Sequence, residues 1–422
     1  MFNLDAKPLH CEHTNSFKPF LFSHSMSDFI REDKAATILS KIQGSFPKVK
    51  LHFSGSTPPE IFVGRVNYPN VFSGILAPDY KGDTTVLASP EEWVKQNLSI
   101  EQVLSHRGSM VYGRQVTNIK ANKSLSAVTQ QLALASKPVS TEFFLKKQPT
   151  LQYTSSSVMS IMANPAPIER VILEENPFIE KKVDYLSTDY DVKATTALKE
   201  LYSSNIQISH LQKLFSAGLL GIKPQRKLVP TKWGITAVDD TLSKYLLEKI
   251  KTYKEISEIL LFSDNYAGNY YHILLLPGEF KFEVMEEAVP SISNLTKENL
   301  MQQDIGFWQD YEGFFGRKDY ASSVTGAYYA NRLSICEYLE KIKRQATIIV
   351  FRETTEEYYA PLGVGILREV TRKAMQGLPE KANSLDSALK IIDSRIKVPI
   401  EKFKKISWII LNYKKQKRLN EF

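Results

Sequence analysis

Adjacent carboxylates offer the clearest catalytic chemistry in this 422-residue chain. Asp239 and Asp240 stand near the start of an expected helix over 236–251. Two neighbouring carboxylates can bind Mg²⁺, which a nuclease uses for in-line attack on a phosphodiester. Glu283 and Glu353, each near the end of an expected strand, are the candidate partners. The same pattern fits a structural role, in which one aspartate complements the helix N-terminus and the other pairs with an arginine or lysine.

Cationic and aromatic side chains suited to nucleic-acid binding accompany these carboxylates. Cations can bind phosphates, and aromatic rings can stack on exposed bases. Such side chains can equally belong to buried ion pairs and a core, so both interpretations stay open. The candidate cations of the body are Arg226, Lys227, Lys232, Arg317, Lys318, Arg344 and Arg352, and the candidate rings are Trp233, Tyr328 and Tyr329.

Other kinds of site find little support. The seven histidines assemble no Ser-His-Asp or Cys-His arrangement, and there is no Cys-x-x-Cys or Gly-x-Gly-x-x-Gly run. Cys336 lies within an expected helix over 319–343 and is interpreted as a small core residue. The segment 54–59, followed by Gly64 and Arg65, either approaches a phosphate through backbone N–H groups or forms a tight structural turn.

The composition is that of a globular protein, with 43% hydrophobic and 24% charged residues. The length suggests two or three domains, or one large body with subdomains. No apolar run reaches the roughly 18–20 residues that span a bilayer, and the first residues lack the features of a signal peptide. Two cysteines in the whole chain fit a reducing compartment. We therefore expect a cytoplasmic protein without a membrane partner.

Helices and strands alternate irregularly, which predicts an α+β fold: a large mixed α/β body, open to division into two subdomains. Ser89, Pro90 and Glu92 provide an N-cap, a first helical proline and a capping-box glutamate, so a helix is expected from Pro90 to about His106. Further strands are expected over 61–66, 71–76, 139–146 and 346–352.

The segment 147–167, rich in Ser, Pro, Thr and Asn, has no periodicity and is a candidate linker or insertion loop. We accordingly divide the chain into an N-terminal α/β region over 1–150, a C-terminal α/β region over 165–394, and a basic helix and tail over 395–422. This last part carries nine basic and two acidic residues, whereas the rest of the chain is nearly neutral. A polyanion would therefore meet its strongest attraction at the C-terminus.

Apolar residues recur every three or four positions from Ile400 to Tyr413, which predicts a terminal helix docked on the body. Lys402, Lys404 and Lys405 lie off this stripe and are candidate contacts for DNA phosphates.

Five segments combine glycine, proline and charge more densely than packing requires. In this order they resemble the archaeal Nre family of DNA-repair proteins. The resemblance covers about residues 45–377 and resumes at the extreme C-terminus. It implies a role in DNA damage repair and a C-terminal peptide that binds the sliding clamp PCNA, but no settled catalytic mechanism. The segments are SGSTPPEIFVGRVNYPNV (54–71), SAGLLGIKPQRKLVPTKWGITAVDDT (216–241), YAGNYYHILLLPG (266–278), DYEGFFGRKDYASSVTGAYYANRL (310–333), and KRQATIIVFRE (343–353) with YYAPLGV (358–364).

The last seven residues resemble a PCNA-interacting peptide, Gln-x-x-aliphatic-x-x-aromatic, through Gln416, Leu419 and Phe422. Their spacing places the three side chains on one face of a 3₁₀ turn, as docking into a hydrophobic pocket requires. The second aromatic that usually follows is absent, so one anchor is missing.

Members of the family typically carry a four-cysteine zinc motif near the N-terminus. This sequence has only Cys11 there, with His10, His13 and His24 nearby, and Cys11-Glu-His13 is too tight for a pair of zinc ligands. Zinc is therefore not expected, and Mg²⁺ is the cofactor that the carboxylates would favour.

Three classes of function remain. The first two are versions of the leading hypothesis, a repair protein that PCNA recruits to DNA. It acts either as an enzyme, such as a metal-dependent nuclease or a base-removing enzyme, or as a non-catalytic adaptor. Four carboxylates that converge in a basic cleft would favour the nuclease, and dispersed, paired carboxylates the adaptor. A deep, mostly apolar, neutral pocket would indicate a metabolic enzyme with a fortuitous basic tail.

Overall fold

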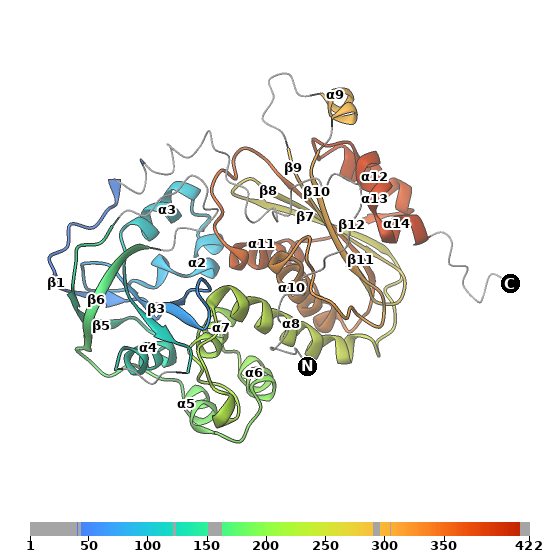
Figure 1. Ribbon diagram of the computed structural model, residues 1–422. Helices are drawn as coiled ribbons and strands as arrows, with labels where there is room; N and C mark the ends of the chain where they lie inside the picture. The colour runs from blue at the N-terminus through green and yellow to red at the C-terminus, as the bar shows by residue number, and fades with distance from the viewer. Residues whose placement is uncertain are drawn as a thin grey trace, which may run out of the picture.

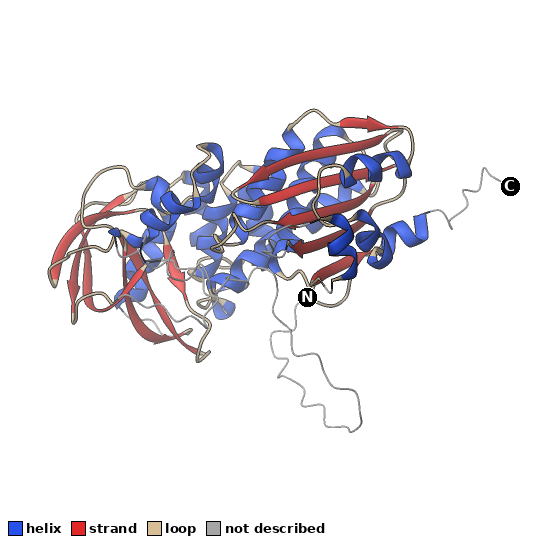
Figure 2. Cartoon of the chain, turned by 90° about the horizontal axis from the view of Figure 1, so that it is seen from above, coloured by secondary structure: helices blue, strands red, loops and turns tan. Residues whose placement is uncertain are grey.

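The computed structural model of the protein describes residues 40, 44–120, 124–150, 163–289, 296–303 and 305–413 (Figure 1). The described residues form two six-stranded mixed sheets, which lie at opposite ends of the molecule with helices between and around them (Figure 2). The α+β fold class is confirmed. The predicted C-terminal tail over 414–422 lies outside the described residues, as do Cys11 and its neighbouring histidines.

The first sheet has the strand order β1-β5-β6-β4-β3-β2 and is antiparallel except between β4 and β6. β6, which begins within segment 147–167, completes this sheet by pairing with both β4 and β5. Its strands are β1 (His52–Thr57), β2 (Ile61–Val63), β3 (Asn70–Ala77), β4 (Val111–Asn118), β5 (Val139–Leu145) and β6 (Asn164–Leu173).

The helices of this half include the one predicted from its capping signals, but it is shorter than expected. The Ser89 side chain accepts a hydrogen bond from the Glu92 amide, and Pro90 opens α2. The chain then turns at Asn97, in the left-handed region, and Ser99 caps a second helix. The expected single helix is therefore two, α2 (Pro90–Lys95) and α3 (Ile100–Gly108), followed along the chain by α4 (Ser124–Leu134).

Helices connect the two sheets and cover one face of the second. One hydrophobic core runs without interruption from the first sheet, through these helices, to that face. The connecting helices are α5 (Lys181–Thr188), α6 (Ala194–Ser203), α7 (Ile208–Ser216) and α8 (Thr231–Ile250), and the later ones are α10 (Gly326–Ile342) and α11 (Val364–Gln376).

The second sheet has the order β10-β9-β11-β8-β7-β12 and is buried on both faces. Successive residues of β11 alternate between the two cores: Ile348 and Val350 face α8, α10 and α11, whereas Ile349 and Phe351 face the C-terminal helices. The strands are β7 (Ile259–Tyr266), β8 (Asn269–Leu276), β9 (Lys281–Ala288), β10 (Phe307–Glu312), β11 (Thr347–Thr354) and β12 (Glu380–Ala382), and the helices of the second face are α9 (Lys297–Gln302), α12 (Leu385–Asp393), α13 (Ile400–Ile406) and α14 (Trp408–Tyr413).

The apolar stripe of the C-terminal segment docks on the body, as predicted, but the helix is broken at Ser407. There the buried Glu283 carboxylate accepts hydrogen bonds from the Ser407 hydroxyl at 2.6 Å and from the backbone amides of Trp408 and Ile409 at 2.7 and 3.1 Å. Because these donors belong to the first turn of α14, Glu283 caps that helix.

A second buried carboxyl under the C-terminal helices predicts a pH-dependent stability. Burial and the charge of Glu353 raise the pKa of Glu287 well above its usual value of 4.5. The folded protein therefore keeps a proton that the unfolded chain releases near this value, and stability falls as the pH rises from about 4.5 toward the raised pKa. Glu287→Gln, which imitates the protonated form, should lose less stability between about pH 5 and about pH 8 than the wild type in urea denaturation.

The exposed residue Glu298 provides the control. Glu298→Gln should follow the wild-type dependence, and an identical dependence in Glu287→Gln would contradict a neutral Glu287.

Candidate nucleic-acid interface

Asp239 and Asp240 lie inside α8 rather than near its start, because the helix begins at Thr231, five residues earlier than predicted. Asp239 is fully buried and accepts hydrogen bonds from Arg368 and Gln212, both at 3.1 Å. Asp240 pairs with the buried Arg332 and, at 2.8 Å, with Lys244. Since neighbouring helix residues point about 100° apart, the two carboxylates face different partners.

The other two candidate carboxylates stabilise the C-terminal segment. Glu283 caps α14, and Glu353 accepts hydrogen bonds from the backbone amides of Lys397 and Val398 at 2.7 and 3.0 Å. Among the residues that the structure describes, no three His, Cys, Asp or Glu side chains are placed to hold a metal ion. The four carboxylates are thus each engaged by protein groups, in separate places.

Several candidates for nucleic-acid contact are buried instead. Arg352 is fully buried and pairs with Glu286 at 2.8 Å. Tyr328 and Tyr329 lie in the core on α10. For these three side chains burial favours the alternative interpretation, a buried ion pair and a core, over contact with DNA. The helix that carries Tyr328 and Tyr329, α10, begins at Gly326 rather than at Asp319 as expected, because residues 313–325 form a loop.

The remaining candidate cations lie nearer the surface, most of them engaged with the protein. Three of them donate hydrogen bonds to backbone carbonyls: Arg226 to those of Ser187, Asp189 and Gly221, Arg344 to that of Lys343, and Lys402 to that of Gln303. Two form ion pairs, Arg317 with Asp310 and Lys404 with Glu401. Lys232 and Lys405 are exposed and Lys227 is partly exposed. Such engaged cations are less available to phosphates.

Three exposed aromatic rings gather around the first turns of α8. Tyr68, Trp233 and Tyr320 keep 41%, 42% and 43% of their surfaces accessible. The Tyr68 and Trp233 ring centroids lie 5.2 Å apart. The Tyr320 hydroxyl lies close enough to Thr236, one turn along α8 from Trp233, and to Arg65 for both to influence its pKa. We call Arg65, Tyr68, Lys232, Trp233, Lys318 and Tyr320 the aromatic–cationic surface.

This surface joins three segments that are far apart in the sequence: 54–71, 216–241 and 310–333. Arg65 and Lys318 form no ion pair with any described residue, and the exposed Asp319 follows Lys318 in the chain. Sequence reasoning selected Trp233, Lys232 and Lys318 but missed the rings of Tyr68 and Tyr320. The available signal was their position within glycine-rich segments that also carry Arg65 and Arg317.

Cations continue beyond this surface along the segment that precedes α8. Lys223 and Arg226 lie over the exposed ring of Tyr190, with their charged atoms 5.1 and 4.6 Å from its centroid. Leu228 packs with Val63 beside the loop that carries Arg65. The region therefore presents rings and cations together, as single-stranded nucleic acid requires for stacking and phosphate contact.

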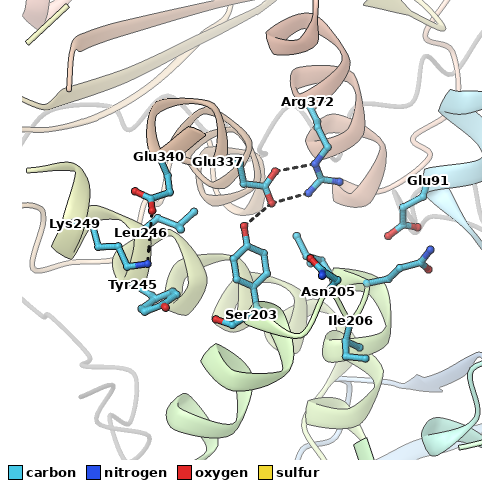
Figure 3. A pocket seen from close by; sticks show the side chains of 13 residues that line it. Glu91, Ser203, Asn205, Ile206, Tyr245, Leu246, Lys249, Glu337, Glu340 and Arg372 are labelled. Carbon is cyan, nitrogen blue, oxygen red and sulfur yellow. Dashed lines mark hydrogen bonds and ion pairs between the residues drawn. The ribbon is translucent and has the colours of Figure 1, made fainter. Parts of the chain in front are cut away.

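A pocket of about 670 Å³ lies between the α6–α7 connection, α8, α10 and α11 (Figure 3). Its charged side chains are largely paired with one another: Arg372 binds Glu337 at 2.8 Å, and Lys249 lies 3.6 Å from Glu340. Glu91 lines its far side. This charged lining differs from the neutral, mostly apolar pocket expected of a small-molecule enzyme.

The chain matches two family models. That described as "Archaeal Nre, N-terminal" covers residues 34–293, and that described as "Archaeal Nre, C-terminal" covers residues 312–422. It is 38% identical to DNA repair protein NreB of Archaeoglobus fulgidus over 340 residues, 80% of this chain and 84% of the relative. It is 34% identical to DNA repair protein NreA of Haloferax volcanii over 354 residues, 82% and 83% of the two chains. No solved structure matches.

Within the described residues, no helix is both long and apolar enough to cross a membrane.

The environment of Asp239 predicts a large loss of stability in Asp239→Asn. The substitution leaves the fully buried Arg368 without its main counter-charge, although Glu369 still lies 3.3 Å away. Removing one partner of a buried pair costs about 3–5 kcal/mol, and we expect about 3 kcal/mol here because Glu369 remains. Urea denaturation measures this loss.

Asp319→Asn, at an exposed site, serves as the control and should change stability by about 0.5 kcal/mol or less. An Asp239→Asn protein of wild-type stability that failed to support damage survival would restore the catalytic interpretation.

Proposed function

The chain belongs to the archaeal Nre family, and from this premise we propose that it is a DNA-repair protein that binds DNA through the aromatic–cationic surface and is tethered to PCNA by its C-terminal peptide. The relatives reported above are named DNA repair proteins. Their names support the repair role. The exposed rings and cations of this chain support DNA binding through the aromatic–cationic surface.

The observation that carries DNA binding is the clustering of Tyr68, Trp233 and Tyr320 with Arg65 and Lys318. Each ring is about two-fifths exposed, and a base stacked on such a ring gains roughly 1–3 kcal/mol. The two cations share the sequence segments of Tyr68 and Tyr320 and form no ion pair with any described residue. Stacking platforms flanked by cations favour single-stranded or locally opened DNA over an intact duplex, whose bases are already stacked.

The tether rests on Gln416, Leu419 and Phe422, which lie outside the described residues. The family's C-terminal match includes them. α14, which ends at Tyr413, directly precedes this peptide, and its Trp408 ring stacks on Tyr311 of β10 at 4.7 Å. The peptide therefore follows a helix that adjoins the strand leading into the loop of Lys318 and Tyr320.

A non-catalytic adaptor agrees better with the carboxylates than a metal-dependent nuclease does. Asp239, Asp240, Glu283 and Glu353 are each occupied by arginines or backbone amides in different parts of the body. Incubating the protein with labelled DNAs that carry defined lesions, with and without Mg²⁺, separates the two functions. Unchanged DNA supports the adaptor, and Mg²⁺-dependent cleavage would support the nuclease.

Clamp binding should depend on the apolar anchors of the tail. Leu419→Ala combined with Phe422→Ala removes both side chains that would fill the clamp's hydrophobic pocket, so PCNA binding should be lost in calorimetric titration. The melting temperature should stay nearly unchanged, which thermal unfolding of the same variant checks. Asn420→Ala with Glu421→Ala, off the anchor face, is the matched control. Retained affinity in the anchor variant would place the clamp-binding site elsewhere.

DNA affinity should depend on salt through the cations of the aromatic–cationic surface. Arg65→Gln and Lys318→Gln should each reduce the slope of log affinity against log salt by about 0.7 on a single strand, because each variant neutralises one phosphate fewer. Lys390→Gln, exposed on α12 across the second sheet, should leave the slope unchanged. Slopes that fell only in Lys402→Gln, Lys404→Gln or Lys405→Gln would assign DNA binding to the C-terminal helices instead.

A further inference from the structure

Phe315 is almost completely exposed, with 96% of its surface accessible. It stands in the loop between β10 and α10, five residues before Tyr320. An isolated exposed apolar residue is ordinary, but a phenylalanine at this extreme contributes little to the core. Its ring meets that of Phe314 edge-on, with centroids 5.5 Å apart, and nearly all of its surface remains available to something outside the chain.

The turn that presents Phe315 is tight and well defined. The Gly316 amide donates to the Gly313 carbonyl at 2.9 Å, and Gly316 has a φ of +81°, which a side chain would disfavour. Phe314 packs against the core, with the Lys251 ammonium 5.2 Å from its ring centroid. The neighbouring phenylalanines thus divide their roles, since Phe314 anchors the turn and Phe315 projects from it.

Arg317 fixes both ends of this turn. Its guanidinium donates to the carbonyls of Tyr311, before the turn, and of Asp319 and Tyr320, after it, at 3.0–3.4 Å. The same group pairs with Asp310, which is nearly buried, at 2.9 Å. These contacts hold the backbone from which Phe315 projects, so less of the loop must be ordered when the side chain binds.

Phe315 shares its loop with part of the aromatic–cationic surface. The loop runs along α8, from Phe314 near Lys251 at the end of the helix to Tyr320 near Thr236 close to its start, so it links Phe315, beside the C-terminal end of α8, to the aromatic–cationic surface at the N-terminal end. Lys318, three residues away, adds a charge that no described residue pairs. An apolar tip flanked by cations is complementary to a base stack flanked by phosphates.

We propose that Phe315 is a wedge that inserts into the DNA base stack where pairing is already weakened, while the aromatic–cationic surface holds the strand. This inference rests on the proposed DNA binding and adds the feature that is recognised. Apolar wedges unstack and kink a base step, and unstacking costs least at a mismatched or damaged base. The protein would therefore select weakened steps without reading their sequence.

The test uses the full-length protein and two duplexes of one sequence, one fully paired and one with a short mismatched bubble that contains 2-aminopurine. The wild type should bind the bubble more tightly and change the fluorescence of the probe. Phe315→Ala should lower affinity for the bubble about tenfold, the size of one aromatic stacking interaction, and suppress the fluorescence change. Its affinity for the paired duplex should change little. Phe315→Trp should keep both responses.

Leu378→Ala is the matched control, because Leu378 is equally exposed, at 97%, between α11 and β12. It should behave as the wild type in every measurement. If Phe315→Ala bound both duplexes as the wild type does and kept the fluorescence change, the wedge would be wrong and DNA binding would stand. If the wild type bound neither duplex, the proposed DNA binding would fail and the wedge with it. A loss of PCNA affinity in Phe315→Ala, with DNA binding intact, would overturn the wedge and make Phe315 a protein-binding residue.

Discussion

Three fully buried arginines, Arg332, Arg352 and Arg368, connect the helices and the second sheet of the C-terminal half. Each guanidinium is held by carboxylates from other elements, among them Asp240 for Arg332 and Asp239 for Arg368. A buried arginine left without its partner costs several kcal/mol, so alternative packings of α8, α10 and α11 are excluded more strongly than by apolar contacts alone. This network fixes where α8 lies, and α8 carries the first turns on which the aromatic–cationic surface is built.

A carboxylate–arginine pair also holds the loop of residues 313–325 in place, closer to the surface. Asp310 accepts hydrogen bonds from the backbone amides of Ser323 and Val324 while it pairs with Arg317, so one carboxylate holds the end of the loop and its bracing cation together. Because this loop lies along α8, the buried pairs and the exposed rings are attached to the same helix. The carboxylates that resemble a catalytic site in the sequence position the elements that carry the aromatic–cationic surface.

The sequence predicted what local patterns determine. Period-3.6 apolar residues indicated the docked C-terminal segment, Ser89 and Pro90 marked the start of α2, and Cys336 was correctly interpreted as a core residue. It could not predict which cation neutralises which carboxylate, since Asp239 and Arg368 are 129 residues apart. Nor could it predict that Tyr328 is buried and Tyr320 exposed, because both occur in one glycine-rich, aromatic segment and their burial depends on contacts with distant parts of the chain.

Under the proposed function, the position of the C-terminal helices would make a modest DNA affinity sufficient. Trp408 stacks on Tyr311 and also lies against Gly313, the first residue of the Phe315 turn, so the helix that precedes the clamp peptide adjoins the proposed wedge. Once such a peptide is held on a clamp that encircles DNA, the body meets the same DNA at an effective concentration in the millimolar range for a short linker. A few stacked rings and nearby cations can then hold a weakened step, whereas free in solution they would release it quickly. Weak binding of this kind would also allow the body to leave intact duplex, so selection for weakened steps would depend on Phe315 more than on total affinity.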